Sequence, residues 1–144
     1  MVVSIGSDHA GFQLKTEIIE YLSNIGSTVI DYGCDSTDSV DYPDYAHAVV
    51  NCLLDGESNI SILICGSANG MCMTANKWLG IRAALCWTKE IAELSRLHND
   101  ANVLCLPARY ISKEDALDIT KAFIETKFEG GRHHNRVNKI NPSI

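Results

Sequence analysis

The chain has 144 residues, of which 46% are hydrophobic and 21% are charged, and its formal net charge is −6. A chain of this length and composition can bury a core of its own, and we expect one domain over residues 1–144. The negative charge argues against binding of nucleic acid or an anionic membrane, because both need a basic surface to meet phosphates. We expect a soluble cytoplasmic protein, since no charged leader precedes a long apolar run at the N-terminus and no stretch of about 18 apolar residues occurs.

The cysteines are not spaced like a disulfide framework or a metal site. Six are present, but the sequence contains no CxxC pair and no HExxH motif. Disulfide frameworks are typical of short secreted domains, so a longer chain without paired spacing favours reduced thiols. We therefore predict free cysteines, no metal and no cofactor.

Short apolar runs alternate with segments of helical period along the chain. The first apolar run covers residues 1–7, and residues 12–25 then repeat apolar side chains on one helical face before Gly26. A second apolar run at residues 28–32 leads through a polar loop into a helix that begins near Pro43. Each of these units reads as a strand, a loop and a helix.

Three further units of the same kind follow. They are a strand at 60–65 with a helix to residue 78, a strand at 81–87 with a helix capped by Thr88, and a strand at 102–106 with a helix to Phe128. Ser112, with Asp115 three residues later, resembles a capping box for the last of these helices. Five strands, each followed by a helix, predict a doubly wound α/β fold with a parallel sheet covered on both faces.

In such a sheet, ligands bind beyond the carboxyl ends of the strands, so the loops after strands are the places to search. After the first strand, Asp8 and His9 could bind a ligand or could cap the following helix. After the third strand, the small residues 66–70 could direct backbone N–H groups at an anion or could form a plain tight turn. Cys65, just before them, is either a reactive thiolate or an inert core residue.

A polar and basic tail, residues 129–144, follows the last helix. Arg132 and Arg136 are four residues apart, which on a helix places both guanidinium groups on one face as a fork for a phosphate dianion. A solvated basic tail is the plain alternative. We interpret His133 and His134 as surface residues and not as metal ligands.

His98 and Asn99 stand near the end of the fourth helix, where a histidine is also favoured by the helix dipole alone. Together with the groups above they supply a candidate base, a second acid or base, an amide cradle for negative charge and an arginine pair for phosphate. An aldose–ketose isomerase uses such a set, because it moves a proton between adjacent carbons through an enediolate without a cofactor. A histidine suits the preceding step, in which the sugar ring is opened.

The whole chain resembles the type B ribose-5-phosphate isomerases, which are grouped with the galactose-6-phosphate and allose-6-phosphate isomerases. The resemblance rests on motifs that occur in the family's order. They are SDHAG at 7–11, DYPDYA at 41–46, ICGSANGM at 64–71, ANKWLGIRAA at 75–84, SRLHNDANVL at 95–104 and EGGRHHNRV at 129–137.

The resemblance implies a role for each of these residues. Cys65 would carry the proton between the two sugar carbons, and His98 would open the ring. The loop amides would stabilise the enediolate, and Arg132 and Arg136, helped by His9 and Arg109, would hold the phosphate. The substrate-binding residues implied in this way are Asp8, His9, Tyr42, Gly66, Ser67, Ala68, Asn69, Gly70, Asn99, Arg109, Arg132 and Arg136.

The resemblance also implies a Rossmann-like three-layer α/β/α sandwich with a five-stranded parallel sheet, and active sites shared between the subunits of a homodimer. The expected reaction interconverts D-ribose 5-phosphate and D-ribulose 5-phosphate through ring opening and a cis-enediolate, in the non-oxidative pentose phosphate pathway. The galactose-6-phosphate enzymes pair two different subunits, whereas this chain carries both Cys65 and His98. That favours a homodimer acting on ribose 5-phosphate, while a six-carbon sugar phosphate, a non-catalytic sugar-phosphate sensor and further pairing of dimers stay open.

Two positions depart from the family. Met71 stands where some members carry a glutamate base, which leaves Cys65 as the base. A cysteine before an anion-binding loop is also typical of a thiol phosphatase. That enzyme needs an arginine six residues after the cysteine, where this chain has Met71, so the sequence argues against a phosphatase. Ala68 replaces a glycine of many members, and we expect that the backbone there does not need a conformation open only to glycine.

Overall fold

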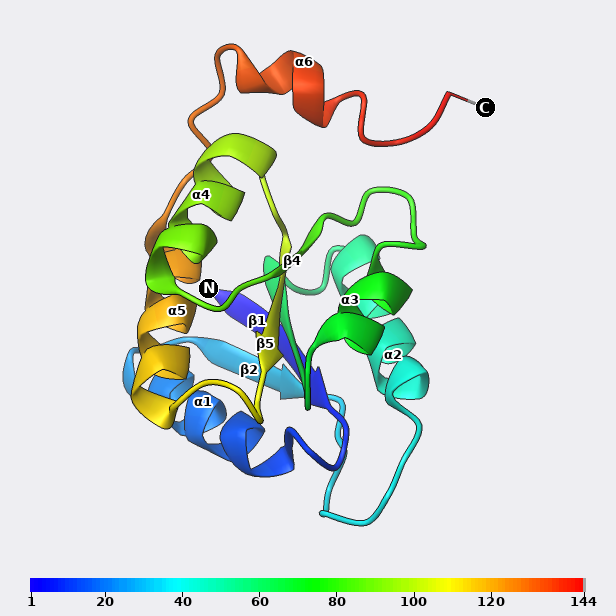
Figure 1. Cartoon of the computed structure of the whole chain (residues 1–144), viewed down its shortest axis with the longest axis vertical. Coiled ribbons are helices and arrows are strands. Elements are labelled where there is room, and N and C mark those ends of the chain that lie inside the picture. Colours follow the sequence, from blue (N-terminus) through cyan, green and yellow to red (C-terminus); the bar gives the residue numbers. More distant parts are fainter. Residues whose placement is uncertain (144) are drawn as a thin grey trace.

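The computed structural model describes residues 1–143. Over these residues five parallel strands form one sheet in the order β2-β1-β3-β5-β4 (Figure 1). The strands are β1 (Val2–Ser7), β2 (Thr28–Asp31), β3 (Ile60–Cys65), β4 (Ala83–Leu85) and β5 (Val103–Pro107). The helices are α1 (Phe12–Asn24), α2 (Tyr42–Leu54), α3 (Asn69–Ala75), α4 (Lys89–Asn99), α5 (Lys113–Glu125) and α6 (His133–Val137).

Alternation along the central strands divides the core into two parts. In β3, Ile60, Ile62 and Ile64 face one core, whereas Leu63 and Cys65 face the other. Every residue of this strand is buried, because the strand pairs with a neighbour on each side and is covered on both faces. The almost wholly apolar composition of this strand, in which Ser61 is the one polar residue, is therefore explained.

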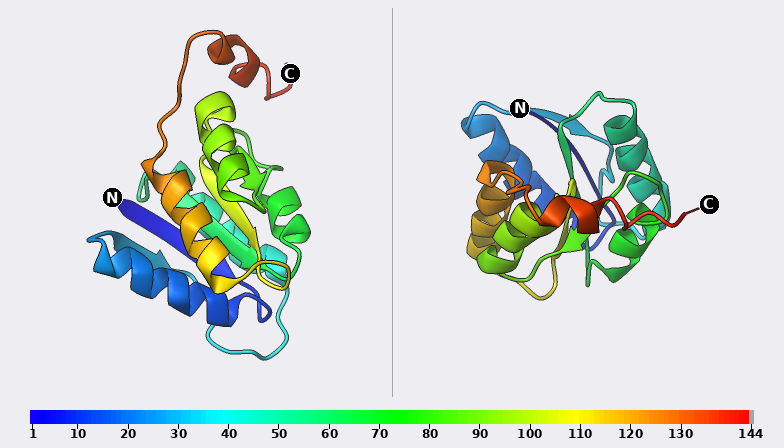
Figure 2. Two further views of the ribbon diagram at one scale, coloured as in Figure 1. Left: turned by 60° about the vertical axis from the view of Figure 1, so that its left-hand side comes forward. Right: turned by 90° about the horizontal axis from the view of Figure 1, so that it is seen from above.

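Helices cover both faces of the sheet, so the predicted doubly wound sandwich is confirmed (Figure 2). The first core contains side chains of α1, α4 and α5, including Ile18 and Phe123. The second core contains side chains of α2 and α3, including Val49 and Met71. Gly6 of β1 lets α2 pack closely, since a Cβ there would lie 2.8 Å from Cγ2 of Val49.

The predicted helix starts are confirmed by their caps. Thr88 accepts a hydrogen bond from the backbone N–H of Ile91, and Ser112 accepts one from that of Asp115. The ends were predicted less well: α5 ends at Glu125 instead of Phe128, and α3 ends at residue 75 instead of 78. Side-chain patterns near a helix end do not record where the backbone hydrogen bonds stop.

The order of the strands decides where a ligand can bind. From β1 the chain continues to β2 at one edge of the sheet, whereas from β3 it continues to β4 at the other edge. The direction of the connections therefore reverses between the neighbouring strands β1 and β3, and ligands bind at such a point in an open α/β sheet. The loops that follow them meet there, as the backbone N–H of Asp8 donates to the carbonyl oxygen of Ile64 over 3.2 Å. This end of the sheet is called the carboxyl edge below.

The last helix lies apart from the sandwich. α6 sits beyond the end of α4, and the segment at 126–132 runs outward to reach it (Figures 1 and 2). Arg132 is the N-cap residue of this helical turn, and Arg136 lies within it. Among residues 1–143, no helix combines the length and the apolar run that crossing a bilayer needs.

Candidate active site

Cys65 ends β3 at the carboxyl edge, and its side chain is 4% exposed. Burial raises the pKa of this thiol above its ordinary value, and the nearby carboxylate of Asp8 adds to the rise. The backbone N–H groups of Met71, Ala68 and Ser67 near the sulfur favour the thiolate and lower the pKa, but they offset only part of the rise. The thiol is therefore protonated at neutral pH in the free protein, and its thiolate is a stronger base than that of an ordinary cysteine.

The expectation for Ala68 is wrong. Its backbone is left-handed, with φ 64° and ψ −7°, the region that glycine enters without a penalty. The loop accepts this strain because the carbonyl of Ala68 receives the N–H of Cys72 at 3.0 Å, while its own N–H points to Cys65. The buried methyl group packs in the second core, so the residue is held firmly.

Asp8 and His9 follow β1 at the same edge. Asp8 is 7% exposed, and its carboxylate accepts the backbone N–H of Gly11 at 3.1 Å. Nδ1 of His9 accepts the backbone N–H of Val40 at 3.2 Å. In a neutral imidazole the proton must then sit on Nε2, which leaves that nitrogen as a donor for an anion.

Tyr42 and Arg109 lie directly over the loop at 66–70. A Cβ added to Gly70 would lie 2.4 Å from Cζ of Tyr42, and a Cβ added to Gly66 would lie 3.2 Å from Nη1 of Arg109. The glycines therefore allow an aromatic ring and a guanidinium group to approach the backbone. The structure brings together, as a first group at the carboxyl edge, Asp8, His9, Tyr42, Cys65, Gly66, Ser67, Ala68, Asn69, Gly70 and Arg109.

His98 and Asn99 do not join this group. They end α4, and Ala101 and Asn102 then lead into the first residue of β5. The last residue of β5, Pro107, is the one that pairs with Cys65. A strand rises about 3.3 Å per residue, so the turn at His98 and the carboxyl edge are separated by more than about 10 Å within one chain.

His98 instead contacts the C-terminal tail. Its ring stacks on that of His133 with a centroid separation of 4.4 Å and an interplanar angle of 15°. Oε2 of Glu129 lies 3.8 Å from Nε2 of His98 and 3.2 Å from Nε2 of His133. His133 is 6% exposed, so the interpretation of it as a surface residue is wrong, whereas His134 is exposed as expected.

A second group therefore forms at the end of α4 from His98, Asn99 and the two arginines of the tail, Arg132 and Arg136. One feature of the sequence could have indicated this second group: Glu129 and His133 are four residues apart and lie next to the arginines. That spacing alone could not identify His98 as their shared neighbour, because 31 residues separate Glu129 from His98 along the chain.

The ligand atoms of His98, Glu129 and His133 lie within 4.8 Å of one another, which is close enough to consider a metal ion. Two histidines and a glutamate are a common zinc set. Two nearly parallel rings, however, direct their in-plane lone pairs side by side, whereas a tetrahedral ion needs lone pairs that converge. The arrangement suits a carboxylate that lies close to Nε2 of both rings better than it suits a metal.

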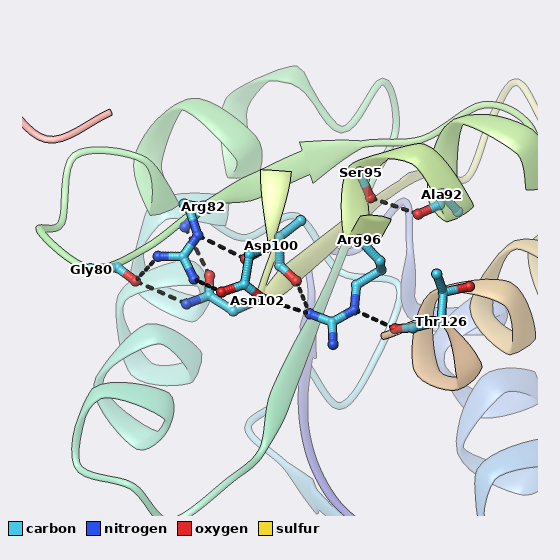
Figure 3. Close-up of polar contacts among 9 residues, drawn as sticks. Gly80, Arg82, Ala92, Ser95, Arg96, Asp100, Asn102 and Thr126 are labelled. Atoms are coloured by element: carbon cyan, nitrogen blue, oxygen red, sulfur yellow. Dashed lines mark hydrogen bonds and ion pairs between the residues drawn. The ribbon is translucent and has the colours of Figure 1, made fainter. Parts of the chain in front are cut away.

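The turn after His98 is held by two arginines (Figure 3). Arg82 donates through Nε to the carbonyl oxygen of Asp100 at 2.7 Å and through Nη2 to its carboxylate at 3.0 Å. Arg96 donates to the carbonyl oxygens of Ala101 and, at 3.1 Å, Thr126. Asp100 itself is left-handed, with φ 48°. These hydrogen bonds hold the backbone that follows His98 and Asn99 in place.

A cavity of about 710 Å³ opens beside the second group. Trp78, Leu79, Ile91, Asn99 and Ile140 contribute to its lining, between the loop after α3, α4 and the tail. Leu79, Ile91 and Ile140 are about half exposed, which is unusual for large apolar side chains gathered in one place. The second group thus borders an apolar surface that could receive another molecule.

The chain is similar to known proteins over almost its whole length. The family model for Ribose/Galactose Isomerase matches residues 3–140. The ribose-5-phosphate isomerase B of Escherichia coli is 44% identical over 138 residues, which cover 96% of this chain and 93% of that protein. The crystal structure of the Thermotoga maritima ribose 5-phosphate isomerase is 47% identical, with a TM-score of 0.97 over 99% of this chain and 98% of that one.

A further solved structure carries a ligand. The Mycoplasma genitalium ribose-5-phosphate isomerase B, with bound ribulose-5-phosphate, is 40% identical with a TM-score of 0.92 and covers 96% of this chain and 93% of that one. With a family match over nearly the whole length and the same fold at this identity, this chain belongs to the Ribose/Galactose Isomerase family and is a sugar phosphate isomerase.

Proposed function

We propose that the chain is a ribose-5-phosphate isomerase that interconverts D-ribose 5-phosphate and D-ribulose 5-phosphate. The observation that carries the proposal is the buried thiol of Cys65 beneath the backbone N–H groups of Met71, Ala68 and Ser67, at the carboxyl edge of the sheet. Relatives named for this activity, and a neighbour with bound ribulose-5-phosphate, support the choice of substrate.

In the isomerisation step Cys65 acts as the base. Its thiolate takes the proton from C2 of the open-chain aldose, and the electron pair forms the enediolate. The thiol returns the proton to C1 while the proton of the C2 hydroxyl passes to O1, so that C2 becomes the carbonyl carbon. Negative charge develops on the sugar oxygens, and preorganised backbone N–H donors of the loop at 66–70 stabilise it. Met71 cannot exchange a proton, so Cys65 is the group of this loop that can do so.

Ring opening precedes that step and is assigned to His98. A proton must leave the anomeric hydroxyl and reach the ring oxygen, and an imidazole can serve as base and acid near neutral pH. Asn99 binds a sugar hydroxyl beside it. Arg132 and Arg136, together with His9 and Arg109, hold the phosphate, to which the Nε2–H of His9 is free to donate.

The two groups require a second subunit. Within one chain Cys65 and His98 lie at opposite ends of β5, so they cannot act on one sugar. In a two-fold homodimer the same surface patch of each chain meets the other, and the second group of one chain can complete the first group of its partner. The half-exposed apolar side chains around the 710 Å³ cavity are a suitable surface for that contact.

The first test separates the two chemical steps. Ribulose 5-phosphate cannot close a five-membered ring because its O5 is esterified, so exchange of its C1 proton with D2O needs enediolate formation but no ring opening. The variant C65A should lose both this exchange and the turnover of ribose 5-phosphate. The variant H98N should lose ribose 5-phosphate turnover far more than exchange. Undiminished exchange in C65A would remove the thiol from the mechanism.

The second test addresses the shared site by mixing inactive variants. Each C65A/H98N heterodimer contains one site with both residues intact and one with neither. Random re-pairing of equal amounts should therefore restore about a quarter of the wild-type sites. If each site lay within one chain, mixing would restore no activity.

Substrate length is tested alongside. Relatives 44–47% identical to this chain include proteins described only as sugar phosphate isomerases, so the substrate of this chain needs direct measurement. We expect a higher kcat/KM for ribose 5-phosphate than for allose 6-phosphate or galactose 6-phosphate. A reversed order would make the chain a six-carbon enzyme with the same mechanism, and binding without conversion of any of the three would indicate a sensor.

A further inference from the structure

His133 is buried although it lies in the polar tail. Within α6, all of which the structure describes, His133 is the one buried side chain. Its ring lies against His98 at 4.4 Å, and its Nε2 lies 3.2 Å from Oε2 of Glu129. The neighbouring His134 offers a direct comparison, because it is exposed. Among the described residues its one aromatic contact is a T-shaped contact with Phe128, with ring centroids 5.0 Å apart.

The segment that carries Glu129 is tied to the last turn of α4. The backbone N–H of Glu129 donates to the carbonyl oxygen of Leu97 at 3.1 Å, and Nε of Arg96 donates to the carbonyl oxygen of Thr126 at 3.1 Å. Gly130 and Gly131 then adopt left-handed conformations, with φ 72° and 56°, a region that residues other than glycine rarely adopt. The chain thus turns back so that His133 and Glu129 meet over His98.

The same helical turn carries the proposed phosphate ligands. Arg132 and Arg136 flank His133 in sequence, and both are exposed, whereas His133 packs inward. α6 otherwise projects away from the sandwich (Figure 2). A phosphate held by the two arginines therefore restrains α6, and α6 transmits that restraint to α4 at the stack of His133 on His98.

We propose that His133, supported by Glu129, is a positioning residue that couples phosphate binding on α6 to the orientation of His98 for ring opening. The inference deepens the proposed function and depends on it. Binding energy from the phosphate, which does not react, would thereby be used to orient the group that opens the ring. Nothing in this role requires His133 to touch the sugar.

The kinetic test uses four variants of the full-length chain and both substrates. H133A removes the ring, H133F keeps a flat ring but loses the contact with Glu129, and E129Q removes the charge. H134A is the matched control on the same helix. We expect H133A to lower kcat for ribose 5-phosphate by about 10- to 100-fold, the loss that a small misplacement of a reacting group produces. Exchange of the C1 proton of ribulose 5-phosphate should stay within about twofold, since that step needs no ring opening.

The pattern among the variants decides the role. H133F should recover a large part of the turnover, E129Q should fall between H133F and the wild type, and H134A should match the wild type. A parallel fall of turnover and exchange in H133A and H133F would mean a merely structural role and would overturn the proposal. An increase in KM for both substrates with unchanged kcat would likewise overturn it, because His133 would then serve phosphate binding alone.

A second measurement needs no turnover, so it separates this inference from the proposed function. Inorganic phosphate is titrated into the labelled protein, and the ring resonances of His98, assigned by their loss in H98N, are followed by NMR. The His98 signals should shift in the wild type and in H134A but not in H133A, while H133A still binds phosphate. Identical shifts in H133A, or phosphate binding without any shift of His98, would refute the coupling. A wild type that couples phosphate to His98 but converts no sugar would instead refute the proposed function alone.

Discussion

The turn after His98 allows a sharp test because two separate effects meet at Asp100. The residue is left-handed, with φ 48° and ψ 45°, and its carboxylate accepts Nη2 of Arg82 at 3.0 Å. Replacing it with glycine removes the carboxylate but suits the backbone. Replacing it with alanine removes the carboxylate and also leaves a Cβ in a region that disfavours it.

The sizes of the two effects can be worked from the geometry. A hydrogen bond between charged groups contributes about 1.5–3 kcal/mol, but Asp100 is 36% exposed and Arg82 is 22% exposed, so we take about 1 kcal/mol. A left-handed alanine adds about 1–2 kcal/mol. D100G should therefore lose about 1 kcal/mol of unfolding free energy, and D100A should lose about 2–3 kcal/mol.

The assay is thermal unfolding of wild type, D100N, D100G and D100A by circular dichroism, all at one protein concentration because association affects the midpoint. For a chain of this size 1 kcal/mol corresponds to about 4 °C, so we expect midpoints lower by about 4 °C in D100G and about 8–12 °C in D100A. D100N, which tolerates the left-handed region and keeps an acceptor, should lose least. Equal midpoints for D100G and D100A would refute the argument from the backbone.

Three further predictions concern the carboxyl edge. In G11A the new Cβ would lie 2.5 Å from the backbone oxygen of Ile64. Because Ile64 belongs to a central strand and cannot shift, the unfolding free energy measured in urea should fall by about 3 kcal/mol. An unchanged unfolding midpoint would contradict this. In G70A the Cβ would meet the exposed ring of Tyr42, which can swing away, so stability should change by less than about 1 kcal/mol. Turnover in G70A should fall as far as in Y42A, and full turnover would show that the ring position is unimportant. Burial raises the pKa of Cys65 above 9.0, the ordinary pKa of a cysteine thiol, so the thiolate fraction should still be growing at that pH. The rate of C1 proton exchange should therefore keep rising through pH 9.0. A plateau of this rate below pH 8 would contradict the raised pKa.

Much of the fold follows from local patterns. The almost wholly apolar run at 60–65 predicted a strand of a sheet covered on both faces, and Thr88 and Ser112 marked the first turns of α4 and α5 correctly. These predictions succeed because strand alternation and N-caps depend on neighbouring residues alone. The error at Ala68 has the opposite origin: a strained backbone is imposed by its surroundings, and the identity of the residue does not disclose it.

The sequence by itself determined the α/β class, the loops that end at the carboxyl edge and the residue types that an isomerase needs. The tertiary structure decided how those residues are grouped. α4 runs back along the sheet, so His98 at its end lies at the opposite end of β5 from Cys65, although the two residues belong to one reaction in our proposal. His133 became a buried neighbour of His98 only through the turn at Gly130, because contacts across 35 residues depend on the path of the chain and not on local preference.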